Sequence, residues 1–299
     1  MTTVSVVIPT VGRSSLSGAV DSALQQSFSV CEVIVVADTA DELGLAANAR
    51  IKVLRCGPGA GAQRARQIGI RDAVGDVIAL LDDDDLWHPY KIEAQMLLLE
   101  ASGPSTTIVS CACVVRRPDG HEKILPRVAI EPRQDIAEYL YTYSLHRSGL
   151  GNGVVQTSTL LFPAQLALDV PLDERADAVH DESTWLLAVR SKYPRTRIEQ
   201  LNDPFVIYRV TPNSLSNNGK NDVSRYLDWG QEHLHDASPR VRGDYYLTSP
   251  VAAAASAGST LGIRQAIRVG SNRGSPGIWA VLYAVAKLLT VSVRAVRQR

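Results

Sequence analysis

Short apolar segments alternate with segments of helical periodicity over the first hundred residues of the chain. Four runs rich in β-branched residues predict buried strands, at residues 4–8, 32–36, 51–54 and 77–81. Between the first two, apolar side chains recur at helical spacing, as at Leu16, Val20 and Leu24, and predict an amphipathic helix. Strands that are apolar on both faces and alternate with helices indicate an α/β fold, with a mainly parallel sheet flanked by helices.

Polar residues follow three of these strands at their carboxyl ends. Pro9 and Thr10 come after the first strand, Asp38 after the second, and the aspartates Asp82–Asp85 after the fourth. In an open α/β sheet, ligands bind in the crevice outside the carboxyl ends of the strands. The sequence therefore predicts one ligand site built from these three strand ends.

The four consecutive aspartates carry the sharpest chemical signal. Like charges this close repel one another, so an ordered carboxylate cluster needs a cation. Mg²⁺ and Mn²⁺ take oxygen ligands and are often shared with substrate phosphates. A solvated acidic loop would explain an isolated run, but a position directly after a buried strand favours a metal-diphosphate site. A calcium loop of the EF-hand type is excluded, because Leu86 and Trp87 stand where a ligand and a glycine are needed.

The second half of the chain is less regular and ends in a helical pattern. Strands are predicted at residues 108–115, 157–162 and 205–210, and a helix at 181–193. From residue 222 onward the periodicity is helical, after a polar segment at 217–221. We therefore expect an α/β domain at 1–220, with a more regular half at 1–105 and a less regular half at 106–220. A helical C-terminal extension at 221–299 follows it.

The last predicted helix raises the question of a membrane. Residues 278–293 are mostly apolar, are interrupted by Lys287, and are followed by Arg294, Arg297 and Arg299. These sixteen residues are fewer than the ~20 that a spanning helix needs. Three interpretations stay open: a helix docked on the core, an interfacial helix beside anionic lipid, and a self-association surface.

Composition narrows the class of protein. Hydrophobic residues make up 45% of the 299 residues, enough for a substantial core. Lys and Arg (31) balance Asp and Glu (31), which argues against a nucleic-acid partner. Four cysteines are too few for a disulfide scaffold, and the N-terminus lacks the basic segment of a signal peptide. We expect a cytoplasmic protein, with peripheral contact at the inner face of the membrane as the second option.

Taken in order, the motifs of the first hundred residues resemble the opening of the family 2 glycosyltransferases, which have the GT-A fold. The resemblance is dense over residues 4–100, thinner to about 216, and absent beyond. It is the ordered set that makes it specific. The segments that carry it are Val4–Thr10, Ser22–Ser27, Val33–Asp38, Gly61–Gly69, Gly75–Asp85 and Pro89–Glu93.

The resemblance implies that 1–220 is a GT-A catalytic domain, with a nucleotide-binding half at 1–105 and an acceptor half at 106–220. It also implies a role for each strand end. Thr10 and Asp38 would meet the nucleotide base, Pro9 would shape the strand end, and Arg66 would lie near the nucleotide. Many relatives have a second acidic residue where this chain has Ala37, which weakens the prediction for base selectivity.

The resemblance also assigns the aspartates. Asp82 and Asp84 would form a D-x-D element that holds Mn²⁺ or Mg²⁺ on the diphosphate, and Asp83 would lie along the ribose. Thr211 stands where many relatives have a histidine, so one further contact to the metal or phosphate is missing.

A later helix would carry the catalytic base. The stretch His180–Trp185 resembles the family's base segment, with Asp181 as the base and Glu182 as the reserve candidate. A carboxylate at a helix N-terminus is also commonly a plain cap, so the residues alone leave both readings open.

The implied activity is an inverting glycosyl transfer from a nucleotide-diphospho-sugar, a UDP- or dTDP-sugar, to an acceptor hydroxyl. The acceptor would be a glycan, a lipid-linked sugar or a small molecule. A sugar-phosphate nucleotidyltransferase shares the fold and the metal but usually begins with a Gly-rich phosphate loop, of which Val11-Gly12-Arg13 is a poor version. A degenerate binding subunit without catalysis is the other alternative, and Ala37 is its only support.

Overall fold

The computed structural model describes residues 2–103, 106–146, 149–175, 179–210 and 222–297. These residues form two compact units. The first comprises Met1–Arg133 with Val155–Thr211, and the second comprises Gln134–Val154 with Pro212–Arg299. The second unit thus takes in residues 134–154, which the sequence alone groups with the acceptor half.

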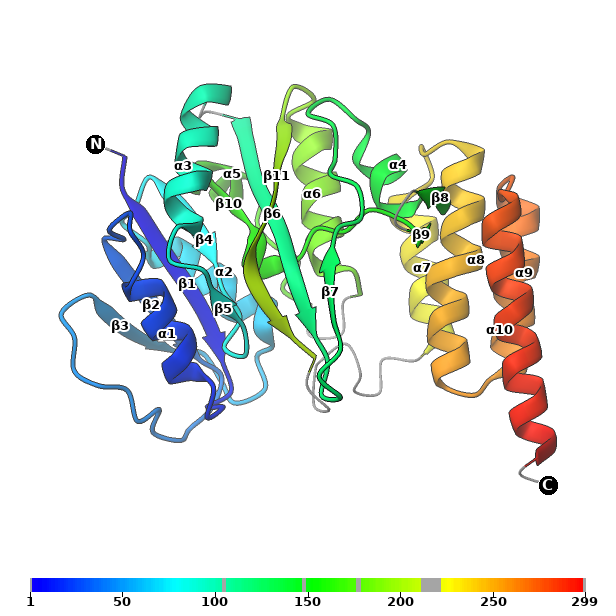
Figure 1. Cartoon of the computed structure of the whole chain (residues 1–299), viewed down its shortest axis with the longest axis horizontal. Helices are drawn as coiled ribbons and strands as arrows, with labels where there is room; N and C mark the ends of the chain where they lie inside the picture. The colour runs from blue at the N-terminus through cyan, green and yellow to red at the C-terminus, as the bar shows by residue number, and fades with distance from the viewer. Residues whose placement is uncertain (1, 104–105, 147–148, 176–178, 211–221, 298–299) are drawn as a thin grey trace. The chain divides into compact units, whose positions relative to one another are not determined.

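A mixed sheet forms the centre of the first unit (Figure 1). Along the sheet, the described strands follow the order β3-β2-β1-β4-β10-β6-β11-β5, and β7 pairs with β6. The four strands at the N-terminal side are parallel, whereas β10 and β5 run antiparallel to their neighbours. The strands are β1 (Val4–Thr10), β2 (Glu32–Ala37), β3 (Ile51–Arg55), β4 (Val77–Leu80), β5 (Leu86–Trp87), β6 (Thr107–Arg116), β7 (Glu122–Leu125), β10 (Leu161–Pro163) and β11 (Arg197–Arg209).

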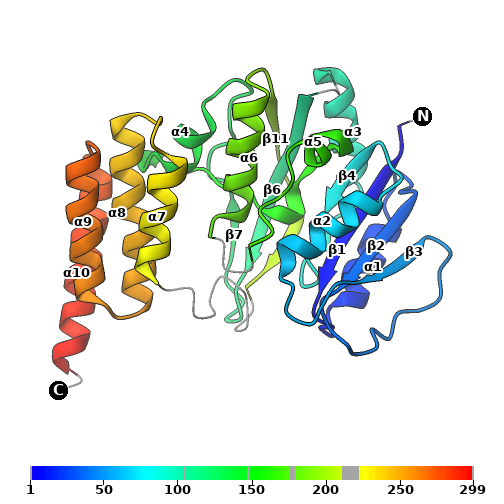
Figure 2. The ribbon, with the colours of Figure 1, turned by 180° about the vertical axis from the view of Figure 1, so that it is seen from behind.

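Helices cover both faces of this sheet, as the two opposite views show (Figures 1 and 2). One face carries α1 (Leu16–Leu24) and α3 (Lys91–Ser102). The other carries α2 (Ala62–Asp72), α5 (Ala164–Asp169) and α6 (Asp181–Lys192). The α/β class and the sheet flanked by helices are confirmed.

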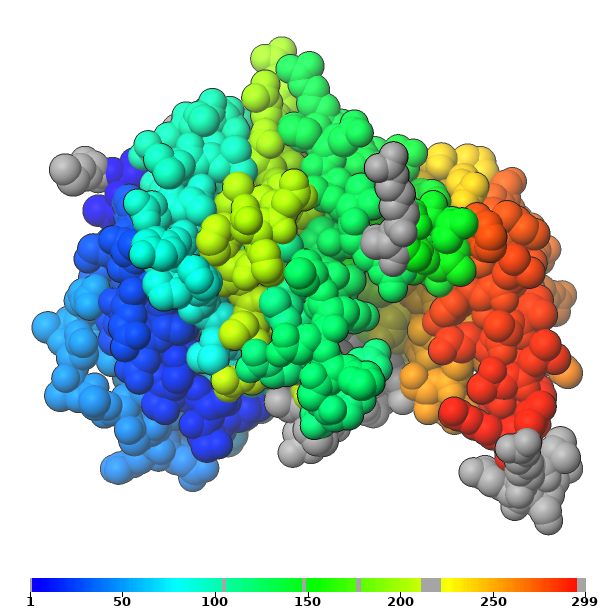
Figure 3. Space-filling view, in the orientation of Figure 1, coloured from blue at the N-terminus to red at the C-terminus, as the bar shows by residue number. Residues whose placement is uncertain are grey.

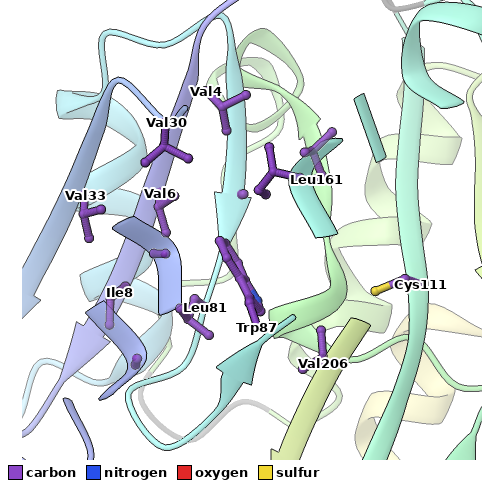
Figure 4. Packing of buried hydrophobic residues seen from close by; sticks show 14 of the residues in the cluster. Val4, Val6, Ile8, Val30, Val33, Leu81, Trp87, Cys111, Leu161 and Val206 are labelled. Atoms are coloured by element: carbon purple, nitrogen blue, oxygen red, sulfur yellow. The ribbon is translucent and has the colours of Figure 1, made fainter. Parts of the chain in front are cut away.

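The core follows directly from the apolar strand pattern. One face of β1 contributes Val4, Val6 and Ile8 to a core cluster that also contains side chains of α1 and α3. Figure 4 shows these three residues in that cluster. Val7, between them, is also fully buried, on the face covered by α2. There Gly69 lets the helix approach closely, since a Cβ on it would lie 2.5 Å from Cγ1 of Val7.

One predicted strand is wrong. Residues 157–162, expected to be a single strand, form a 3-10 turn at Thr157–Thr159 and only then the short strand β10. The reason is chemical, because the buried hydroxyls of this turn bind neighbouring polar groups instead of pointing alternately from a sheet. The strand predicted at 205–210 is the second half of the longer β11.

The second unit is helical, with a short hairpin. It contains α4 (Ile136–Tyr141), β8 (Ser144–His146), β9 (Gly149–Gly151), α7 (Val223–His233), α8 (Pro239–Ser256), α9 (Thr260–Arg273) and α10 (Ile278–Arg297). Its aromatic core brings Tyr141 of α4 within 5.4 Å of Trp229 and 5.0 Å of Tyr245, measured between ring centroids. The fully buried Asp244 accepts hydrogen bonds from the backbone N–H groups of Tyr143 and Gly277. These contacts explain why residues 134–154 belong with the C-terminal helices. Among the described helices, none is long and apolar enough to cross a membrane.

Candidate functional site

The carboxyl ends of β1, β2 and β4 meet at one edge of the sheet. Strand β1 lies between the other two, and Thr10 is the register partner of Ala37. The hydroxyl of Thr10 donates a hydrogen bond of 2.6 Å to Asp83, which follows β4. The backbone N–H of Asp38 donates to the carbonyl of Thr10 at 2.7 Å. The structure therefore brings together the three strand ends that the sequence singled out.

Asp83 is held inside the protein. Its side chain is 2% exposed, and besides the Thr10 hydroxyl its carboxylate binds Nη1 of Arg13 at 2.5 Å. The same guanidinium lies 3.6 Å from the carboxylate of Asp84. Arg13 is a site residue that the sequence missed, because nothing in its local pattern points to an aspartate seventy positions later.

Asp85 fixes the turn after β4. Its buried carboxylate accepts hydrogen bonds from the Ser158 hydroxyl at 2.6 Å, the Gln156 amide at 2.8 Å and the backbone N–H of Arg209 at 3.1 Å. The Ser158 hydroxyl also accepts from the backbone N–H of Asp82 at 3.0 Å. Burial and then the charge of Asp82 raise the pKa of Asp85 well above its usual value, against these hydrogen bonds. The 3-10 turn at Thr157–Thr159 thus orders the acidic loop.

Asp82 and Asp84 are the two aspartates that keep partial exposure, at 22% and 13% of their side chains. Burial, followed by the charge of Asp82, raises the pKa of Asp84 to about 6. The described residues contain no group of three or more His, Cys, Asp or Glu side chains arranged to hold a metal. Two carboxylates with excess negative charge nevertheless fit a Mg²⁺ or Mn²⁺ ion that takes its other ligands from phosphate and water, a common arrangement for Mg²⁺.

Arg66 connects this pair to the start of α6. It is buried on α2, and its Nη2 binds Asp82 at 2.5 Å. Burial alone would lower the pKa of Arg66, but the charges of Asp82, Glu182 and Asp181 outweigh it and leave the pKa raised. The charge of this one guanidinium therefore interacts both with Asp82 of the predicted metal site and with the two candidates for the catalytic base, Asp181 and Glu182.

The base candidates open helix α6. Asp181 is its first residue, and the preceding His180 has a left-handed backbone with φ of 58°. Such a conformation is uncommon outside glycine and often marks a functional site. Glu182 accepts a hydrogen bond from the Thr157 hydroxyl. Its pKa is raised, first by burial and then by Asp181, while Thr157 and Arg66 act in the opposite direction.

Asp38 shapes the loop before α2. Its two carboxylate oxygens accept hydrogen bonds of 2.8 Å from the backbone N–H groups of Ala60 and Gly61. A Cβ at Gly57 would lie 1.5 Å from Oδ1 of Asp38, so only glycine leaves room for the carboxylate there. Asp38 therefore fixes the N-terminus of the helix that carries Arg66.

Comparison with known proteins gives independent evidence on the family of this chain. The family model described as "Glycosyl transferase family 2" matches residues 5–155. The amylovoran biosynthesis glycosyltransferase AmsB of Erwinia amylovora is 27% identical over 238 residues, which cover 75% of each chain. The UDP-Glc:alpha-D-GlcNAc-diphosphoundecaprenol beta-1,3-glucosyltransferase WfgD of Escherichia coli is 25% identical over 257 residues, 82% of this chain and 90% of that one.

Among solved structures, residues 1–349 of TarS from S. aureus superpose with a TM-score of 0.53 at 14% identity. The match covers 99% of this chain and 92% of that one. At this identity the likeness concerns the fold alone, and it agrees with a GT-A type arrangement.

Proposed function

The chain belongs to glycosyl transferase family 2 and is a transferase, and on that premise we propose that it moves a sugar from a nucleotide-diphospho-sugar to an acceptor hydroxyl with inversion. The observation that carries the proposal is the convergence of Asp82, Asp181 and Glu182 on buried Arg66, with Asp84 two residues after Asp82 in the acidic loop. Inverting transfer needs a stabilised leaving group and a base for the acceptor on the opposite face of the sugar. This cluster offers carboxylates for both tasks.

The donor would bind at the ends of β1, β2 and β4. Pro9, Thr10 and Asp38 line the edge where the base and ribose would lie, and Asp83 keeps Thr10 in place. Arg66 and Asp82 would lie beside the diphosphate. A UDP-sugar is the first donor to test, because the printed name of WfgD specifies UDP-Glc, and a dTDP-sugar is the second.

Asp82 and Asp84 would hold a divalent ion, Mn²⁺ or Mg²⁺. When bound, the ion stabilises the negative charge that develops on the departing nucleoside diphosphate. Ionised Asp84 is needed for this, and its raised pKa means that a cation and a proton compete for the same carboxylate. Arg66 holds Asp82 in place through their ion pair.

Asp181 would take the proton of the acceptor hydroxyl as general base, an effect of about 10²–10⁴-fold. Glu182 is the weaker candidate, because its carboxylate is engaged by the Thr157 hydroxyl. Its role would be to position the start of α6, with Arg66 between it and Asp82.

The acceptor that we propose is a saccharide linked through diphosphate to a lipid. This class is named for WfgD, of which the match covers 90%. Glycans without a lipid and small-molecule acceptors are the alternatives.

The decisive experiment measures release of nucleoside diphosphate from a panel of UDP- and dTDP-sugars, with and without Mn²⁺. We expect Mn²⁺-dependent release that stops on chelation. Asp181→Asn should lose about 10²-fold or more in turnover with unchanged affinity for the nucleotide. Glu182→Gln, its neighbour on α6, should lose less. Unchanged turnover in Asp181→Asn would refute the base assignment, and release of pyrophosphate instead of nucleoside diphosphate would identify a nucleotidyltransferase.

A further inference from the structure

The outer face of α10 carries a stripe of exposed apolar side chains. The stripe consists of Ile278, Leu282, Val285, Leu289 and Val293, which are between 45% and 63% exposed. They recur every three or four residues and so share one face of the helix. The face that packs in the second unit is lined instead by Ala280, Ala284 and Val291. Figure 3 shows the surface of this segment in red.

A regular exposed stripe of this length needs a partner. Single exposed apolar residues are normal on a protein surface, but a contiguous apolar strip marks an interaction site. The helix is not a spanning segment, because none of the described helices is long and apolar enough to cross a bilayer.

The charge distribution of the C-terminal helices favours an anionic partner. Residues 245–299 contain seven basic residues and no acidic one, which leaves 24 basic against 31 acidic residues in the rest of the chain. The neighbouring helix α9 presents Arg264 and Arg268 on its exposed face, together with Leu261, which is 77% exposed. Arg294 is exposed in the last turn of α10.

We propose that α9 and α10 form a docking surface for an anionic lipid bilayer. The apolar stripe of α10 would enter the boundary between headgroups and acyl chains, and the arginines would be attracted to the acidic headgroups. A second copy of the chain is disfavoured, because two such surfaces would bring arginines against arginines with no acidic residue of the segment to pair them. Docking of this kind would hold the enzyme at the surface where lipid-linked acceptors reside.

The test is flotation of the full-length protein with vesicles, without any sugar substrate, so that its result is independent of the proposed reaction. One set of vesicles is phosphatidylcholine alone, and the other mixes phosphatidylcholine with phosphatidylglycerol. We expect flotation with the anionic vesicles, little with the neutral ones, and release at high salt, since salt screens exposed charges.

Two variants separate the contributions of the stripe and the arginines. Leu282→Ser combined with Leu289→Ser removes apolar area, and Arg264→Gln combined with Arg268→Gln and Arg294→Gln removes charge. Each should partition at least about tenfold more weakly into anionic vesicles. The matched control joins Leu97→Ser, 64% exposed on α3, with Arg133→Gln, exposed in the first unit, and should float like the wild type.

Three results would overturn the proposal. They are absence of flotation with anionic vesicles, equal flotation with neutral ones, and a dimer in light scattering that the Leu282→Ser/Leu289→Ser variant converts to a monomer. The last would assign the stripe to self-association. If a variant fails to fold by circular dichroism, the lipid and salt dependence of the wild type still decides the question.

Discussion

At the scale of single residues, Arg66 is the group on which the predicted site depends most. Its guanidinium is buried, forms an ion pair with Asp82 and is also stabilised by the charges of Glu182 and Asp181. Removing one partner of a buried charge cluster leaves the remaining charges uncompensated, which is more costly than the loss of the ion pair itself.

Arg66→Met should therefore reduce the free energy of unfolding by about 3–5 kcal/mol and turnover by at least about 10²-fold. Arg66→Lys should recover part of the stability, because an ammonium supplies the charge but not the planar fork. Urea unfolding and nucleoside diphosphate release measure the two effects. The matched control is Arg71→Met on the same helix, whose ion pair with Glu174 is half-exposed and worth about 0–1 kcal/mol. Equal losses of unfolding free energy in Arg66→Met and Arg71→Met would show that Arg66 does not compensate a buried charge cluster.

We expect ionised Asp84 to destabilise the metal-free protein, although the proposed metal site needs its charge. Because burial and Asp82 raise its pKa to about 6, the folded state binds the proton more tightly than the unfolded state. Stability from this group is present below the unfolded pKa and is lost as pH rises through 6. Asp84→Asn should therefore stabilise the metal-free protein at pH 7, on the order of 1–3 kcal/mol, with no gain at pH 4. It should also abolish stabilisation by Mn²⁺.

Asp76, at the other end of β4, is the matched control for this prediction. Hydrogen bonds from the backbone and hydroxyl of Thr3 lower the pKa of Asp76, so its contribution has the opposite sign. Asp76→Asn should lose stability at pH 7 and keep its response to Mn²⁺. Thermal denaturation at both pH values, with and without Mn²⁺, checks the pair. A destabilised Asp84→Asn at pH 7 would contradict the charge repulsion inferred for the acidic loop.

At the scale of elements, the approach of α2 to β1 sets the position of Arg66. A Cβ on Gly69 would lie 2.5 Å from Cγ1 of Val7, inside the packed interior, so Gly69→Ala must displace the helix or the strand. Overpacking of this kind costs about 1–3 kcal/mol. Gly18→Ala on α1 is the matched control, since its Cβ would meet Leu86 at an ordinary 3.5 Å. It should gain up to about 1 kcal/mol of helix propensity. Denaturant midpoints measure both, and a neutral Gly69→Ala would show that α2 can move freely.

Local patterns predicted the elements of the first hundred residues, because each strand there is a short apolar run and its polar end follows directly. The strands β5 and β10 could not be read this way. Strand β5 pairs with β11 at two residues and β10 pairs with β4 at three, and the one register partner of β10 on β6 is Val109, opposite Leu161. The same holds for the site: Asp82 and Arg66 belong to motifs that the sequence displays, whereas the bond between Arg13 and Asp83 exists only in the fold.

At the scale of the whole molecule, the chain has two cores. The first unit is built on the sheet and contains every described residue of the predicted catalytic site, whereas the second is built on the aromatic cluster around Tyr245 and on buried Asp244. Residues 134–154 join the second core through Tyr141 and Tyr143, although they interrupt the first unit in sequence.

Two cores predict two thermal transitions, which scanning calorimetry can resolve. UDP with Mn²⁺ should raise the transition temperature of the first unit alone, because a ligand stabilises only the unit that it binds. At a hundred times the dissociation constant, the free energy of unfolding of that unit should rise by about 2.7 kcal/mol. Asp244→Ala should lower the transition temperature of the second unit, since it leaves the part-buried N–H groups of Tyr143 and Gly277 without their acceptor, at a cost of about 1–3 kcal/mol each. Asp236→Ala, at an exposed position, should change neither transition. A single transition that shifts as a whole with both UDP and Asp244→Ala would mean that the units unfold as one, and that the second core stabilises the site as well.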